Sequence, residues 1–78
     1  MEFSLRELDS LDIYFEWGTI THEEIDSLWD NDDMIIVSNI TKLDTIESGD
    51  HVYDFIYEGY LQELSTWITF KLHSSYEL

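Results

Sequence analysis

Residues 21–33 read THEEIDSLWDNDD, and this acidic stretch is the element around which the rest of the chain is organised. It holds six carboxylates and no Lys or Arg, while Ile25, Leu28 and Trp29 recur within it at helical spacing. Thr21 followed by Glu24 matches the capping box, in which a hydroxyl and a carboxylate satisfy the first N–H groups of a helix. The stretch therefore predicts a short helix at about 22–30, with one apolar and one negative face, ended by the acidic run 31–33.

The segments on either side of this helix have the patterns of β-strands. Strict alternation over residues 11–17, with Leu11, Ile13, Phe15 and Trp17 on one side, predicts a half-buried strand that Gly18 ends. The continuous apolar run 34–37 predicts an inner strand that can extend to residue 40. Aromatic and β-branched residues at 51–57 predict a third strand after the turn signal 48–50. Residues 65–73 predict a fourth strand with Ile68, Phe70 and Leu72 inward.

Three segments leave alternatives open. Residues 51–64 also fit a helix, but Gly59 in its middle would cost about 1 kcal/mol, so the strand is favoured and 58–63 become a connection. Residues 1–10 fit a loose helical turn or an irregular lead-in, and residues 41–47 fit a turn or a strand edge. The combined prediction is one α+β domain over residues 1–78, in the order β-α-β-β-β, with an antiparallel sheet of about four strands and one short helix.

Charge restricts the partners of this domain. Eighteen Asp and Glu stand against three Lys and Arg, for a formal net charge of −15. Such a chain is repelled by nucleic acid and by anionic membrane surfaces, and attracts basic proteins. No apolar run approaches 18 residues and no secretory signal pattern is present, so we expect no membrane span. The absence of Cys excludes disulfides and thiolate chemistry, and favours an intracellular setting.

Metal and catalytic motifs are not found. Residues 30–33 resemble the start of a calcium loop, but Met34 and Ile35 occupy the positions where an EF-hand needs an oxygen ligand and a Gly. His22, His51 and His73 are isolated from one another in the sequence, and no nucleophile elbow or Gly-rich phosphate loop occurs. We therefore expect neither a cofactor nor an enzyme.

Spacing is what gives the carboxylates a candidate role. Phosphates lie about 7 Å apart along a DNA strand, alternate residues of a β-strand about 6.5–7 Å apart, and helix neighbours three or four apart about 5–6 Å apart. Two acidic rows are predicted to bind a partner, supported by aromatic anchors on outward strand positions or beside a bend at Glu58-Gly59. The first row contains Glu23, Glu24, Asp26, Asp30, Asp32 and Asp33; the second contains Asp44, Glu47, Asp50, Asp54 and Glu58; the anchors are Tyr57, Tyr60 and Trp67, and Tyr14 also points outward. The competing interpretation is a solvated polar face.

In size, charge, lack of Cys and Pro, and aromatic-rich strands between acidic turns, the chain resembles the small phage-encoded DNA mimics that inhibit CRISPR effectors, restriction enzymes or DNA-repair glycosylases. The resemblance implies stoichiometric inhibition by occupying a DNA-binding site, and it implies neither a fold nor a catalytic residue. We therefore expect a non-enzymatic inhibitor of a nuclease or CRISPR effector, acting in the host cytoplasm as a monomer or small homo-oligomer. An immunity protein or antitoxin for a cationic toxin, a calcium-responsive domain and a subunit of a larger assembly remain alternatives.

Overall fold

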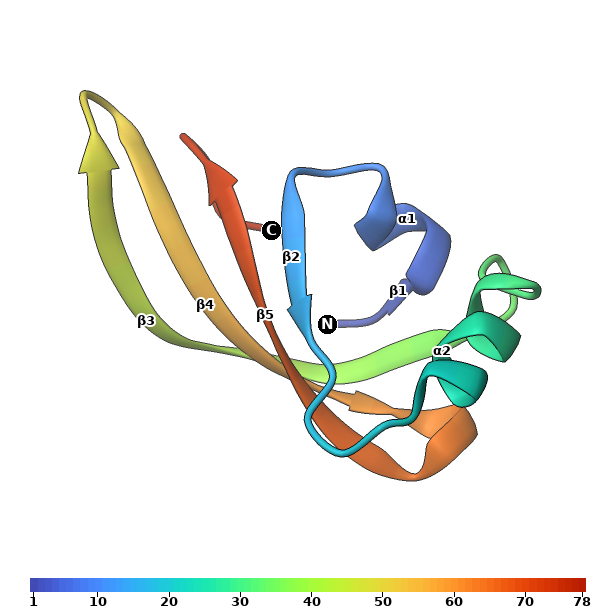
Figure 1. Ribbon diagram of the computed structural model, residues 1–78. Helices are drawn as coiled ribbons and strands as arrows, with labels where there is room; N and C mark the ends of the chain where they lie inside the picture. The colour runs from blue at the N-terminus through green and yellow to red at the C-terminus, as the bar shows by residue number, and fades with distance from the viewer.

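Three long strands, β3 (Ile36–Gly49), β4 (Val52–Leu61) and β5 (Thr66–Ser74), form the body of the computed structural model, which describes residues 1–78 (Figure 1). Two short strands complete the antiparallel sheet, since β1 (Phe3–Ser4) pairs with β3 and β2 (Ile13–Glu16) pairs with β5. The spatial order is β1-β3-β4-β5-β2. The predicted α+β domain with one antiparallel sheet is therefore confirmed, with five strands rather than about four.

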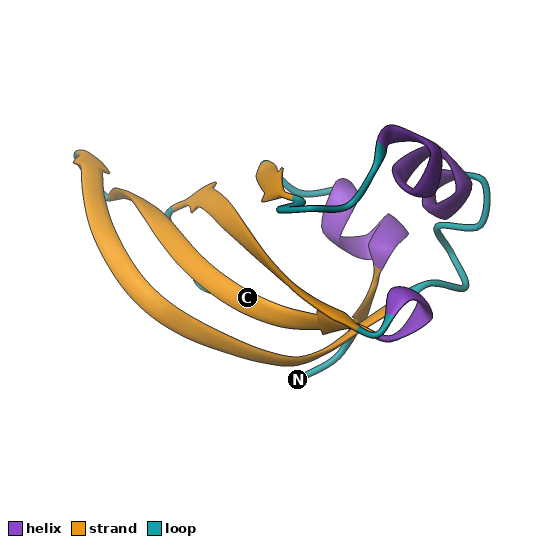
Figure 2. Ribbon diagram, turned by 60° about the horizontal axis from the view of Figure 1, so that its bottom comes forward, coloured by secondary structure: helices purple, strands orange, loops and turns teal.

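The sheet curves strongly, and its helices lie on the concave side, away from the tip of the β3–β4 hairpin (Figures 1 and 2). These are α1 (Leu5–Asp9), α2 (His22–Trp29) and the 3-10 turn η1 (Gln62–Leu64). The convex side of the three long strands carries no helix in either view. The domain is elongated, with a longest dimension of 38 Å, so its helical end and its hairpin end are well separated.

Helix α2 begins as its sequence predicts. The Glu24 N–H donates to Thr21 Oγ1 (3.3 Å), and the Thr21 N–H donates back to a Glu24 carboxylate oxygen (3.3 Å). A second capping box starts α1, where Ser4 Oγ accepts from the Glu7 N–H (3.2 Å) and a Glu7 oxygen accepts from the Ser4 N–H (3.0 Å). The first ten residues therefore contain a short strand and a helix. In both α1 and α2, a glutamate side chain completes the capping box in the first turn.

The later strands are longer than predicted. β3 runs through residues 41–47, and β4 continues to Leu61, so the connection predicted at 58–63 is wrong for residues 58–61. The helical alternative for 51–64 is excluded, since only residues 62–64 form a 3-10 turn. A bulge at Asn39, which has a φ of 51°, shifts the β3 register between Ser38 and Thr41 and directs Ile40 into the core. The turn of the β3–β4 hairpin is at residues 50 and 51, slightly later than predicted.

Twelve buried apolar residues form one core on the concave side of the sheet. Alternate residues of β4 and β5 contribute the largest part, and the predicted inward set Ile68, Phe70 and Leu72 is confirmed. β2 adds Phe15, which contacts Trp29 of α2 edge-on at 5.9 Å between ring centroids, so aromatic packing joins helix to sheet. Leu11 was predicted inward and is exposed, because it precedes the first residue of β2.

Gly59 lies opposite Ile68 and is itself buried among core side chains. A Cβ placed on Gly59 would lie 2.5 Å from Val37 Cγ1 and 3.4 Å from atoms of Ile40 and Phe70. The absence of a side chain at this point leaves room for the side chains of Val37, Ile40 and Phe70 above the β4 backbone. The residue that suggested a bend in the sequence is therefore a packing site within a continuous strand.

We predict that Gly59→Ala lowers the free energy of unfolding by about 1–3 kcal/mol, because the added methyl group overpacks a close contact. Urea denaturation of the wild type and the variant measures the change. Gly49→Ala is the matched control, since a Cβ there meets no atom within 4 Å, and its stability should stay within about 0.5 kcal/mol of the wild type. Equal losses in the two variants would contradict tight packing at Gly59.

Repulsion among the negative charges on the surface opposes this packing. No carboxylate is buried, and only Asp32, Asp54 and Glu58 are even partly covered. Two ion pairs use Lys or Arg, Arg6 with Asp32 and Lys42 with Glu77, so the other carboxylates have no strong cation beside them. Added salt therefore screens far more repulsion than attraction.

We predict that raising NaCl from about 10 mM to about 150 mM increases the Tm of the domain. A gain of about 1 kcal/mol raises the Tm of a domain of this size by about 4–8 °C. Thermal unfolding followed by far-UV circular dichroism measures it. Replacing Asp26, Asp30 and Asp33 with Asn should raise the low-salt Tm and reduce its salt dependence. A Tm that falls with salt would show that ion pairs outweigh the repulsion.

Candidate functional site

Helix α2 presents the most regular group of carboxylates. Glu23, Asp26 and Asp30 are exposed and spaced three and four residues apart, so they share one helix face at separations of about 5–6 Å. Asp33 follows in the exposed loop. We call Glu23, Asp26, Asp30 and Asp33 the α2 row. Its carboxylates make no ion pair within the chain and are available to a partner.

Two of the six carboxylates predicted for this row are engaged locally. Glu24 caps α2 through Thr21, which uses one of its oxygens. Asp32 accepts from Arg6 Nη2 (3.0 Å) and Nε (3.1 Å), and its side chain is only 19% exposed. This ion pair joins α1 to the acidic loop across 26 residues of sequence. Glu24 and Asp32 therefore hold the row in place, and the other four carboxylates form its free surface.

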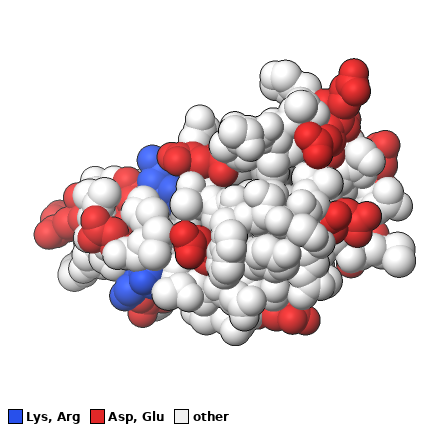
Figure 3. All heavy atoms as spheres, turned by 90° about the horizontal axis from the view of Figure 1, so that it is seen from below, with Lys and Arg blue, Asp and Glu red and all other residues white.

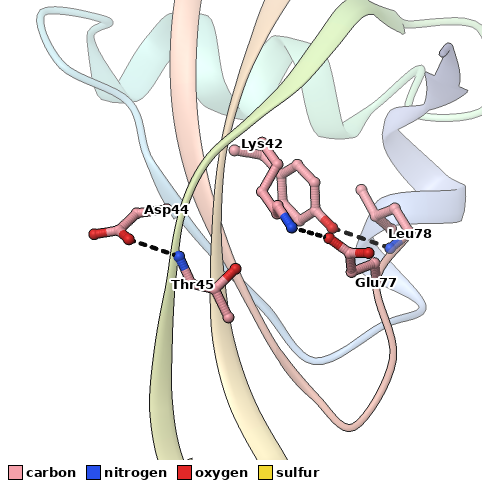
Figure 4. Close-up of polar contacts among 6 residues, drawn as sticks. Lys42, Asp44, Thr45, Glu77 and Leu78 are labelled. Carbon is pink, nitrogen blue, oxygen red and sulfur yellow. Dashed lines mark hydrogen bonds and ion pairs between the residues drawn. The ribbon is translucent and has the colours of Figure 1, made fainter.

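The five carboxylates predicted as a second row do not form one row. The β3 register shifts between Lys42 and Asp44 and again between Glu47 and Gly49, so their side chains fall on different faces. Glu47 is paired with Tyr53 on the concave side, whereas Asp54 and Glu58 lie on the convex side. Asp50 is in the hairpin turn, and Asp44 accepts from the Thr45 N–H at 2.8 Å (Figure 4).

The convex face has its own arrangement of charge. Asp54 and Glu58 are about 13 Å apart along β4, since they are four positions apart in the strand. His73 Nδ1 lies 2.7 Å from an Asp54 oxygen. Glu16 of β2 reaches the same face and accepts from Thr69 Oγ1 at 3.2 Å, at the level of Glu58. Sequence reasoning did not select Glu16 because its place beside Glu58 depends on strand pairing across β5.

The aromatic anchors divide between surface and core. Trp67 is 53% exposed and pairs across the strands with Tyr60, with ring centroids 5.2 Å apart in a T-shaped contact. The prediction for Tyr57 is wrong, because its side chain is only 3% exposed and stacks on Phe70 at 5.5 Å. The bend expected beside Tyr57 does not exist, since β4 continues through Gly59 with Tyr57 on its inward side.

Seen from below, the molecule carries acidic side chains at both ends and along its rim, around a broad area without Asp or Glu (Figure 3). Uncharged side chains make up that area. The carboxylates therefore do not form a single continuous track. They surround an area without Asp or Glu, which is the arrangement of a charged rim around an uncharged centre.

The chain's own cations offer little competition to a basic partner. Glu77 holds Lys42 from the C-terminal segment, which crosses the concave face (Figure 4). The hydrogen bond to Glu77 raises the pKa of Lys42, against a smaller opposing effect of desolvation. Leu78 fixes the same segment by donating its N–H to the Tyr57 hydroxyl at 3.1 Å. Lys71 lies 5.9 Å from the centre of the Tyr14 ring.

No three His, Asp or Glu side chains are grouped so as to hold a metal ion. None of the helices combines the length and the apolar character that a membrane span requires.

Comparison with known proteins adds no assignment. The chain matches no protein-family model, no curated protein and no solved structure.

Proposed function

We propose that this protein is a non-enzymatic inhibitor that occupies the basic nucleic-acid-binding cleft of a nuclease or CRISPR effector in the host cytoplasm. The observation that supports it most is the surplus of free carboxylates: of eighteen, only Asp32 and Glu77 contact a Lys or Arg. An ordinary soluble surface intersperses both signs of charge. A surface of this kind attracts a cationic cleft over long range and speeds encounter with it.

The α2 row is the part that stands in for phosphates. Its helical separations of about 5–6 Å approach the spacing of about 7 Å along a DNA strand. A capping box and the Arg6–Asp32 ion pair hold its helix and loop, so the row loses little conformational freedom on binding. On the convex face of the sheet, opposite to α2, Trp67 and Tyr60 offer apolar contact area that charge alone lacks.

An immunity protein or antitoxin for a cationic toxin is the second candidate. The acidic rim around an uncharged area favours it, because this arrangement resembles the apolar centre and polar rim of protein–protein interfaces. The two candidates differ in whether DNA competes with the protein for its partner.

Inhibition assays test the leading proposal. Purified CRISPR nuclease, restriction endonuclease and DNA-repair glycosylase are each incubated with the protein before a labelled duplex is added. We expect at least one activity to be lost at a stoichiometric ratio, with protection when duplex is bound first and an association rate that falls steeply with salt. Full activity of all three classes would contradict the proposal, and inhibition that DNA does not relieve would favour the second candidate.

Two charge-matched triple variants test the α2 row. One replaces Asp26, Asp30 and Asp33 with Asn; the other replaces Asp44 with Asn, Glu47 with Gln and Asp50 with Asn. Each removes three negative charges, so a net-charge effect weakens both equally. We expect the α2-row variant to associate with the inhibited enzyme about tenfold more slowly than the hairpin variant. Equal rates would show that total charge, and not the row, determines binding.

A further inference from the structure

A groove of about 460 Å³ lies between α2, the loop that follows it and η1. Its floor is apolar, with Leu28 and Ile35 from the edge of the core and the half-buried Leu64 from η1. Met34 lies beside this floor with 76% of its surface exposed. Because Leu28 and Ile35 are almost fully buried, the exposed apolar surface of the groove comes mainly from Met34 and Leu64.

The walls of this α2–η1 groove are acidic and polar. Glu23 and Glu24 come from α2 and Glu63 comes from η1, while no Lys, Arg or His lines the groove. Glu24 is engaged in the cap of α2, but Glu23 and Glu63 make no ion pair or side-chain hydrogen bond within the chain. Two free carboxylates from separate elements thus border one apolar floor.

An arginine side chain matches this combination. Its aliphatic stem can lie along Met34 and Leu64 while its guanidinium reaches the carboxylates, as amphipathic side chains do at such boundaries. A guanidinium carries five N–H donors in a fixed plane, and Ser27 Oγ and the Asn31 amide oxygen are further acceptors in the lining. Lysine offers three donors on a more strongly hydrated ammonium, so it matches less well.

We propose that the α2–η1 groove takes an arginine side chain and an adjacent apolar side chain from the basic partner. This inference rests on the proposed function, since it identifies what the partner inserts beside the α2 row. The groove converts a long-range attraction into a specific contact: Glu23 and Glu63 select the guanidinium, and Met34 and the floor bury the neighbouring apolar group. A desolvated, charge-paired contact of this type is typical of an interface hot spot.

Peptide titration tests the groove without any nuclease present. The probes are the acetylated, amidated hexapeptides GSRLSG, GSKLSG and GSRSSG, added to ¹⁵N-labelled protein at low salt. We expect GSRLSG to shift amide signals of Ser27, Asn31 and Leu64 and to bind at least threefold more tightly than either other peptide. Shifts spread evenly over all acidic segments, or equal affinities for the three peptides, would overturn the groove.

Single-charge variants complete the test. Glu63→Gln and Glu23→Gln should each weaken GSRLSG binding about fivefold or more, whereas Glu2→Gln, the same substitution at an exposed position outside the groove, should change it less than twofold. Equal effects of all three substitutions would overturn the inference. Groove binding without inhibition of any nuclease would remove the proposed function alone; inhibition that survives Glu63→Gln, with no groove shifts, would remove the groove alone.

Discussion

Repulsion among exposed carboxylates acts against the packing of a core of only twelve buried residues. The fold reduces the conflict by using acidic side chains where they stabilise the backbone. Glu7 and Glu24 both close capping boxes, and the first turn of each helix is where the helix dipole favours negative charge. Aromatic residues then supply a large buried area per side chain, which suits a chain with few residues to bury.

Curvature of the sheet gives the molecule a concave side that forms the core and a convex side that faces solvent. The concave side holds the twelve buried apolar side chains together with the helices, and Gly59 leaves room there for the side chains of Val37, Ile40 and Phe70. The convex side and the outer part of β3 remain open to solvent. Beyond Ile40, β3 has no strand on its outer edge, but bulges and the charged residues Lys42, Asp44 and Glu47 make that edge a poor template for pairing.

Local patterns in the sequence predicted the elements that capping boxes and apolar periodicity determine. The Thr21–Glu24 box predicted α2, and the alternation in 65–73 predicted β5. The same box at Ser4 and Glu7 decides between the two alternatives for residues 1–10, a loose helical turn and an irregular lead-in, since it starts α1. The apolar alternation fades after Ile40, because β3 there extends past the core and both its faces are exposed, so no pattern marked the strand. Tyr57 was misplaced for a related reason: a Gly that accommodates a neighbouring strand looks in sequence like a Gly that ends one.

The candidate site was less predictable, because its parts meet only through the tertiary structure. Nothing in the sequence pairs Asp32 with Arg6, places Glu16 at the level of Glu58, or brings Glu63 to the same groove as Glu23. Composition predicted that the surface would be negative, and the fold determined which carboxylates are free. A count of acidic residues in a stretch therefore overstates its binding surface, since Glu24 and Asp32 serve the scaffold.

The distance between the two acidic ends determines how such a surface can act. The domain is 38 Å long, whereas charges are screened over about 8–10 Å at physiological salt. The hairpin end and the α2 end are therefore electrostatically independent of each other. The α2 end combines free carboxylates with a groove that no Lys, Arg or His lines, because η1 and the loop after α2 meet there. The hairpin end contributes to attraction and orientation, while short-range binding energy concentrates at α2, where burial of apolar surface can add to charge pairing.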